Sequence, residues 1–194
     1  MAKLTEVTAP AVEPLDVSEI KAHLRIDHSD EDDDLDTLIA DVREALEREH
    51  WTQFCTATYD QYFDSFGDPM TLRRPPVGTV ASVKYTDTAG DEQTVAATVW
   101  EQGLVNKVGV VRLKYDQVWP SDKRSHPDSV VIRFTAGYGG AAAVPGGIRR
   151  AMKMFCEHLY DPARGRIVMN ATVTKVPFAV EHLMQPYSFA EPVA

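Results

Sequence analysis

The sequence predicts an α+β fold in which helical segments at both ends of the chain flank a β-rich unit. Three observations lead to this fold class. Apolar residues recur at helical spacing over residues 35–46, alternate with polar residues over much of 56–136, and return to helical spacing over 148–159. The predicted order is helix, helix, β unit, helix and a final short helix.

The first two helices are predicted from their start signals and their apolar faces. In residues 14–27, Asp16 lies at an N-cap position with Glu19 three residues later, as in a capping box, and Ile20 and Leu24 share one face. Residues 1–14 are expected to form an N-terminal arm. The second helix presents five apolar residues on one side, namely Leu35, Leu38, Ile39, Val42 and Leu46. Together these helices form a predicted helical part over residues 15–54.

The middle of the chain, residues 55–137, predicts a β-rich unit of five or six strands between Thr56 and about Ala136. Its strands are expected in "TATYDQYFDSF", in the stretch from Met70 to Trp100, and in "GVVRLKY" and "SVVIRFTAGY". "TAGD" is a predicted hairpin turn in which Gly90 supplies a positive φ. The strands are expected to stop at the prolines, which are Pro75, Pro76, Pro120 and Pro127.

Helical spacing returns in residues 138–194. "VPGGIRRAMKMFCEHLYDP" predicts a helix with Pro145 in its first turn, Pro162 at its end and one apolar face, formed by Ile148, Met152, Phe155, Cys156 and Leu159. An irregular, partly extended connection, "ARGRIVMNATVTKV", is expected to lead to a last short helix in "PFAVEHLMQPYSF". That helix is predicted to begin at a proline and to have Phe178, Leu183 and Met184 on its apolar side.

The composition indicates an ordinary folded protein. Its 194 residues are 44% hydrophobic, which is enough for one sizeable core or two small ones. The net charge of −9 repels phosphate groups on average, so a sequence-specific DNA-binding protein is not expected, although DNA can pass by such a surface. Cys55 and Cys156 do not form a disulfide framework or a zinc motif. We therefore expect a protein of the reducing cytoplasm.

The sequence predicts neither a membrane span nor a secretory leader. No apolar run approaches the ~20 residues needed to cross a bilayer. The first residues, "MAKLTEVTAPAVEP", lack a hydrophobic core and a cleavage signal.

The stretch "SDEDDDLD", Ser29–Asp36, contains six carboxylates in eight residues and has two competing interpretations. As a calcium loop that starts at Asp30, it would need glycine at position 6 and glutamate at position 12, but Leu35 and Asp41 stand there. As the start of the second helix, its negative charge is favourable by roughly 0.3–1 kcal/mol per exposed group. The sequence favours the helix start. A catalytic carboxylate pair is not favoured, because this cluster is expected to be solvated.

No catalytic constellation is present. The six histidines form no HxH or HExxH pattern, and no GxSxG occurs. "AGYGGAAAVPGG" precedes a helix, but it lacks the GK[ST] ending of a phosphate loop, so a flexible joint is favoured. Arg149 and Arg150, in the first turns of that helix, remain able to attract an anion. We predict no enzyme activity, no cofactor and no metal.

The order of the segments resembles the head–tail connector (adaptor) proteins of long-tailed bacteriophages, prophages and gene transfer agents. The similar segments are "PLDVSEIKAHLRIDHSDEDDDLDTLIADVREALE", "RRPPVGTVASVKYTDTAG", "YDQVWPSDKRSHPDSVVIRFTAGYG", "VPGGIRRAMKMFCEHLYD" and "PFAVEHLMQPY". They cover most of the chain in the family's order, and none of them is a catalytic motif. Such proteins usually have a short acidic turn between the first helix and the long second helix, and the turn in this chain is at the acidic end of their range.

The resemblance implies a small helical bundle with an inserted antiparallel β-rich unit and a docking tail at the end of residues 138–194. It implies a structural subunit without enzyme activity, forming a ring of about twelve copies beneath the portal protein at the head–tail joint of the virion. The ring would contact the portal on one side and the stopper or tail-completion protein on the other. DNA would pass through its channel without sequence-specific binding. Assembly would take place in the host cytoplasm, with no membrane partner.

Two groups of residues are candidate sites within this resemblance. The first is expected to contact the portal or a neighbouring subunit, or else to close the helical core of its own subunit; it consists of Phe178, Val180, Leu183, Met184 and Tyr187. The second is expected to face the DNA channel, or else simply to face solvent; it consists of Asp30, Asp32, Asp33, Asp34 and Asp36.

Two alternative functions stay open at the level of sequence. One is another phage neck or tail-completion protein, which would share the fold class and occupy a different ring. The other is a small nucleotide-binding protein or enzyme, against which the lack of a catalytic constellation counts.

Overall fold

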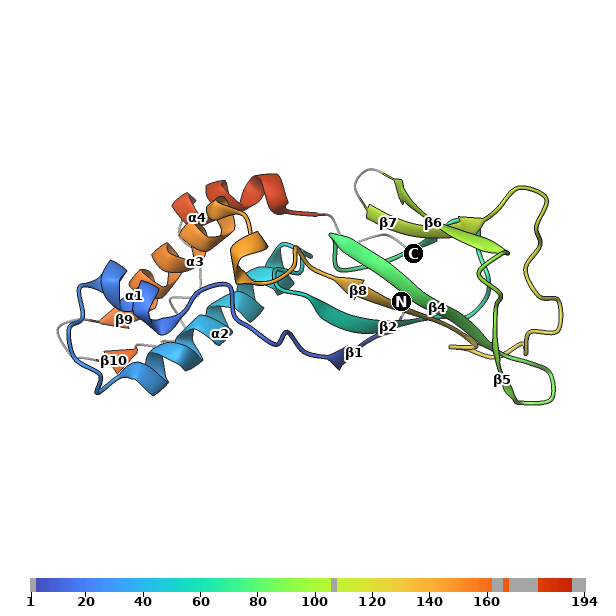
Figure 1. The fold of residues 1–194 in the computed structure, drawn as a ribbon, viewed down its shortest axis with the longest axis horizontal. Helices are drawn as coiled ribbons and strands as arrows, with labels where there is room; N and C mark the ends of the chain where they lie inside the picture. The colour runs from blue at the N-terminus through green and yellow to red at the C-terminus, as the bar shows by residue number, and fades with distance from the viewer. Residues whose placement is uncertain (1–2, 106–107, 162–165, 168–177, 190–194) are drawn as a thin grey trace. The chain divides into compact units, whose positions relative to one another are not determined.

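The structure, a computed structural model, describes residues 3–105, 108–161, 166–167 and 178–189. The chain divides into two compact units. A β unit contains the described residues up to Ala11 and Thr56–Gly137, and a helical unit contains Val12–Cys55 and the described residues from Tyr138 to Phe189. Helices make up one unit and antiparallel sheets the other (Figure 1), which confirms the predicted α+β class.

The two N-terminal helices of the helical unit form where the sequence predicts them. Helix α1 spans Val17–Leu24, and the Asp16 carboxylate accepts a hydrogen bond from the Glu19 amide at 2.8 Å, as an N-cap residue does. Helix α2 spans Asp32–Glu49 and buries the predicted apolar face of Leu35, Leu38, Ile39, Val42 and Leu46. The acidic run therefore lies ahead of and within the first turn of α2.

The C-terminal helices complete the helical unit. Helix α3 spans Gly146–Leu159 after a short 3₁₀ turn at Ala141–Ala143, and Pro145 stands at its N-cap rather than in the first turn. Strands β9 (Tyr160–Asp161) and β10 (Arg166–Ile167) pair with each other. Helix α4 spans Phe178–Met184 and continues as the 3₁₀ turn η2, Gln185–Tyr187. The predictions for Pro162, for Pro177, for most of 163–176 and for the end of the docking tail, 190–194, lie outside the described residues.

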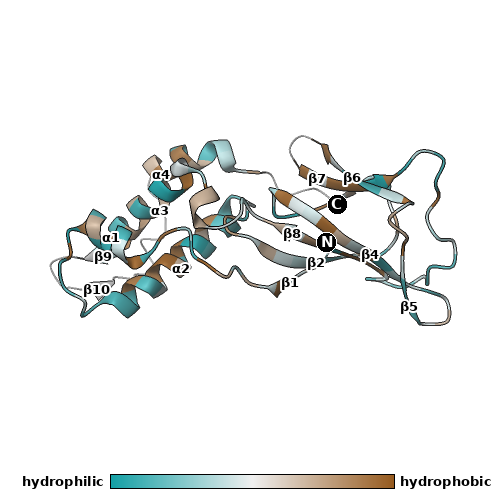
Figure 2. Ribbon diagram, in the orientation of Figure 1, coloured by the Kyte–Doolittle hydropathy of each residue, from teal (hydrophilic) through white to brown (hydrophobic). Residues whose placement is uncertain are grey.

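One apolar core holds the helical unit together. Side chains from α1, α2, α3 and α4 meet in it, and Ile20, Leu38 and Met152 are among its fully buried members. Figure 2 shows hydrophobic and hydrophilic residues alternating along α2 and α3, as expected for helices with one buried face. Gly147 has a specific role in this packing, because a Cβ there would lie only 3.0 Å from the ring of Tyr187. The second glycine of "VPGG" thus lets η2 approach the start of α3.

The β unit contains two antiparallel sheets that share an apolar core. The larger sheet has the order β1-β2-β8-β4-β5, formed by Leu4–Thr8, Ala57–Phe63, Val130–Ala136, Val77–Thr86 and Glu92–Thr94. The smaller has the order β3-β7-β6, formed by Met70–Thr71, Val108–Leu113 and Trp100–Val105. The shared core includes Ile132 and Phe134 of the first sheet. It also includes Val111, within β7 of the second sheet, and Leu72, directly after β3.

The strand predictions require one correction. Seven strands lie between Thr56 and Ala136 in the described part of the chain, instead of five or six, and β1 adds a further strand from the expected N-terminal arm. The predicted hairpin is confirmed, because β4 pairs with β5 across a turn in which Gly90 has a φ of +98°. The prolines named above lie between strands, as predicted.

Candidate functional site

The C-terminal segment places four of its five predicted contact residues in the core of its own unit. Val180 and Met184 are fully buried, and Leu183 and Tyr187 pack against the same core. The ring of Tyr187 also meets Tyr138 edge to face, with centroids 6.5 Å apart. These four residues therefore close the helical core of their own subunit, which is the second of the two alternatives expected from the sequence. Their contact with a partner stays a prediction.

Phe178 differs from the other four. Its side chain is 82% exposed and stacks on His182 with ring centroids 6.4 Å apart, so its expected place on the apolar side of α4 is wrong. It borders a shallow hollow of about 260 Å³, together with His50, Gln185 and Ser188. Burial holds the pKa of His50 below its usual value despite Glu49 and Glu181, so this imidazole is neutral at pH 7. Glu181 and His182 complete the lining of this hollow. An exposed aromatic ring at its edge is suited to a protein contact rather than to chemistry.

The acidic run forms a charged, open helix start. Asp30, Asp33, Asp34 and Asp36 are exposed, whereas Asp32 is half-buried and accepts a hydrogen bond from Lys21 Nζ at 2.7 Å. Glu31 accepts one from the Tyr160 hydroxyl at 2.9 Å. Across the described residues, no three His, Cys, Asp or Glu side chains gather as a metal site. Whether the run faces a channel stays a prediction.

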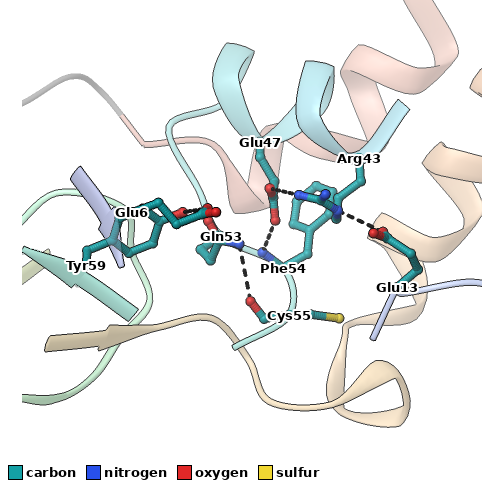
Figure 3. A network of polar contacts seen from close by, with 8 residues as sticks. All are labelled: Glu6, Glu13, Arg43, Glu47, Gln53, Phe54, Cys55 and Tyr59. Carbon is teal, nitrogen blue, oxygen red and sulfur yellow. Dashed lines mark hydrogen bonds and ion pairs between the residues drawn. The ribbon is translucent and has the colours of Figure 1, made fainter. Parts of the chain in front are cut away.

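A buried ionic network, drawn in Figure 3, fixes the segment that follows α2. Arg43 donates to Glu13 at 2.7 Å and to Glu47 at 2.8 Å, and Glu47 in turn accepts the Phe54 amide at 2.7 Å. Burial alone lowers the pKa of Arg43, but Glu47 and Glu13 outweigh that effect and raise it above its ordinary value. Every charge in this network has a partner, so it is a structural feature of the helical unit and not a reactive site.

A groove between α1 and α3 in the helical unit has a volume of about 610 Å³. Its lining residues are Glu19, His23, Gly146, Arg149, Arg150, Lys153, Met154 and Glu157. Glu19 accepts hydrogen bonds from Arg149 at 2.6 Å and from Lys153 at 3.1 Å. Although burial raises the pKa of Glu19, these two cations outweigh it and hold that pKa below its usual value. We call this hollow the basic groove.

The sequence predicts only part of the basic groove. It indicates that Arg149 and Arg150 can attract an anion. The spacing of four residues between Arg149, Lys153 and Glu157 places them along one side of α3, which was the available signal. Their pairing with α1, where Glu19 and His23 lie, depends on tertiary packing across about 130 residues of chain.

The β unit exposes large apolar side chains that sequence reasoning missed. Four of them are open to solvent, and Tyr115 is 98% exposed. Leu104 and Val105 lie at the end of β6, whereas Tyr115 and Val118 lie in the loop after β7. Such side chains are commonly found where a protein contacts another macromolecule. None of the helices described is both long and apolar enough to span a bilayer.

Comparison with known proteins identifies the segment that contains α1 and α2. Residues 14–63 match the family described as phage gp6-like head-tail connector proteins. The match covers 50 of the 194 residues and shows that this segment is similar to head–tail connector proteins. The match confirms the predicted resemblance over residues 14–63, and the matched family is described as one of head–tail connector proteins. No curated protein sequence matches the chain.

The fold is similar, over nearly the whole chain, to chains in structures of gene transfer agent particles. The neck of an empty gene transfer agent particle, computed with C6 symmetry, matches with a TM-score of 0.77 and 24% identity, covering 99% of this chain and 98% of that one. The neck of the native particle, computed with C12 symmetry, matches with a TM-score of 0.73 and 23% identity over the same shares. A virion of the native particle gives a TM-score of 0.74 and 24% identity over 98% and 97%. At these identities the likeness establishes the fold.

Proposed function

We propose that the chain is a head–tail connector subunit, which forms a ring beneath the portal protein and joins the DNA-filled head to the stopper and tail. The observation that supports this most is the family match of residues 14–63, which include α1, α2 and all of β2. The fold likeness to gene transfer agent necks adds support across the rest of the chain. The place of action is the head–tail joint of a virion or a virion-like particle, after synthesis in the host cytoplasm.

The proposed ring contains about twelve copies, in keeping with the C12 symmetry used for one of the similar necks. A closed ring requires two different surfaces on each subunit, one that meets the preceding copy and one that meets the following copy. DNA passes through the central channel without sequence-specific contacts, which suits a chain with a net charge of −9.

Docking to the portal or to a neighbour is proposed to use the exposed ring of Phe178. Val180 and Met184 would contribute to this docking indirectly, because they anchor α4, and with it Phe178, in the core of the helical unit. The opposite face of the ring is proposed to receive the stopper or tail-completion protein.

A second candidate is another neck or tail-completion protein. The similar structures are described only as neck or virion, so their names fit any ring of the neck equally well. The two candidates differ in which half-assembled particle the subunit binds.

Deleting the gene from the phage, prophage or gene transfer agent cluster that carries it tests the proposal. Electron microscopy of the lysate is expected to show DNA-filled heads and complete tails that are not joined. Intact particles at normal yield would refute a role at the head–tail joint.

A binding experiment then separates the two candidates. Purified full-length protein is added in turn to the heads and to the tails recovered from the deletion lysate, and each is sedimented. A connector is expected to sediment with heads and to make them competent to join tails. Binding to tails alone would identify a tail-completion protein.

A further inference from the structure

The unexplained feature of the helical unit is a basic groove on a strongly acidic chain. Three permanently positive side chains, Arg149, Arg150 and Lys153, line it against the two carboxylates of Glu19 and Glu157, while the whole chain has a net charge of −9. Glu19 already engages Arg149 and Lys153, so the positive charge left over belongs to Arg150. Arg150 is exposed and has no ion pair among the described residues.

Two further features of the groove favour a negatively charged occupant. Arg149 binds Glu19 through Nη2, while its buried Nε has no hydrogen-bond partner within the part of the chain that the structure describes. Gly146 begins the 14-residue helix α3 inside the groove, and no described side chain caps this helix. The partial positive charge of an uncapped helix start adds to that of the arginines.

The chain itself contains a matching ligand. Asp30, Asp33, Asp34 and Asp36 are exposed at the start of α2, and none of them forms an ion pair with another described residue. Within one copy this run contacts Lys21 and Tyr160, through Asp32 and Glu31, and none of its residues lines the groove. The unpaired carboxylates and the unpaired guanidinium therefore lie on separate surfaces of the same unit.

We propose that the basic groove of one subunit receives the acidic start of α2 from the next subunit in the ring. This inference rests on the proposed function, since a ring needs a contact between two different surfaces that repeats from copy to copy. Opposite charges on those surfaces fix the direction of the contact and oppose back-to-back pairing. The acidic run is then a contact between neighbours rather than a lining of the channel.

DNA and an acidic segment of the portal are the competing occupants. Glu19 and Glu157 lie in the groove itself and disfavour a continuous line of phosphates. They are compatible with a short acidic segment that brings a few carboxylates to Arg150 and to the start of α3.

Charge exchange tests the contact in the gene-deletion strain complemented with variants. Arg150→Glu is made alone, and three of the four exposed aspartates are replaced by lysine one at a time, in Asp33→Lys, Asp34→Lys and Asp36→Lys. Each lysine variant is then combined with Arg150→Glu in one chain. Arg124→Glu, an exposed arginine of the β unit with no ion pair among the described residues, makes the same change of charge elsewhere.

We expect Arg150→Glu to lower the yield of joined particles about tenfold, because the same weakened contact recurs at every boundary in the ring. Arg124→Glu is expected to leave the yield unchanged. Both arginine variants are expected to keep the thermal unfolding midpoint of the unmodified chain, whereas the lysine variants should lower it by about 2–4 °C, because they remove favourable negative charge from the start of α2. At least one combined variant is expected to restore joining, since each copy then offers exchanged charges to its neighbour.

The outcomes separate this inference from the proposed function. Normal joining with Arg150→Glu and with every lysine variant would overturn the groove contact, while the deletion phenotype would still support a connector. Loss of joining without rescue by any combination would also overturn it and assign the groove to another partner. If Asp33→Asn and Asp34→Asn particles join normally but fail to deliver DNA, the acidic run faces the channel and the contact between neighbours is refuted.

Discussion

Phe178 and Met184 lie six residues apart on α4 in opposite environments. Met184 is fully buried among residues from the other helices, whereas the ring of Phe178 is 82% exposed. A single segment can thus contain one residue that holds the subunit together and another that is free to contact a partner. Sequence spacing alone did not separate them, because both are apolar and the segment is short.

Alanine substitutions should separate these two roles. Met184→Ala removes a buried side chain and leaves a cavity, so it should lower the free energy of unfolding by about 2–4 kcal/mol. Phe178→Ala should change it by less than about 0.5 kcal/mol while reducing the joining of heads to tails. Urea unfolding followed by circular dichroism measures the first effect and particle yield the second. Equal stability losses for both variants would contradict this assignment.

The network around Glu47 makes a second prediction at the scale of residues. Glu47→Ala removes one of the two carboxylates that bind Arg43, so that Glu13 still binds it. The same substitution removes the acceptor of the Phe54 amide. Removing one partner of a buried ion pair typically costs about 3 kcal/mol. Glu49→Ala, an exposed glutamate on the same helix, is the matched control and should be nearly neutral. Similar unfolding midpoints in urea for the two variants would show that the network contributes little.

At the scale of elements, the helices were predictable and the edge strands were not. The apolar face of α2 and the Asp16 N-cap appear directly in the sequence, because helix periodicity and capping are local. Two strands of the β unit that the sequence did not reveal, β1 and β6, each lie at the edge of a sheet. Their residues are mostly exposed or half-buried, so they lack the alternating pattern, and only pairing with β2 and β7 defines them.

The N-cap of α1 gives a prediction with a defined pH dependence. Hydrogen bonds from the Ser18 hydroxyl and the Glu19 amide lower the pKa of Asp16 below its unfolded value. The charged cap therefore stabilises the fold fully above the unfolded pKa of about 3.9 and loses this contribution as the pH falls through the folded pKa.

Two substitutions at Asp16 measure this effect. Asp16→Ala should cost about 1 kcal/mol at pH 7. Asp16→Asn keeps a capping oxygen without the charge, so its stability deficit should shrink as the pH is lowered below about 4. Chemical unfolding between pH 3 and pH 7 provides the test, and a deficit that grows on acidification would contradict it.

At the scale of the whole molecule, the basic groove shows what sequence reasoning cannot assemble. Arg149 and Glu19 are separated by 130 residues, and their contact exists only once α1 and α3 pack together. The same reasoning did locate both ingredients, the acidic run and the arginines at the start of α3. The sequence alone does not show that Arg149 and Lys153 both bind the carboxylate of Glu19, which leaves Arg150 available.

The response of the whole chain to calcium tests the rejected interpretation of the acidic run. Because the run lacks the glycine and glutamate of a calcium loop and forms a helix start, millimolar Ca²⁺ should leave the thermal unfolding midpoint unchanged relative to a chelator. Differential scanning fluorimetry of the full chain is sufficient. A rise of several degrees with calcium would restore the metal-loop interpretation.

The insertion of the β unit between α2 and α3 has a consequence during synthesis. Helix α2 ends at Glu49, but its partner α3 begins only at Gly146, after β2–β8 have been made. At about 5–20 residues per second, the ribosome needs roughly 5–20 s to supply that partner. Throughout this interval the apolar side of α2 is present on the nascent chain without α3 to cover it. The newly made subunit is therefore a natural client for chaperones that shield emerging hydrophobic helices.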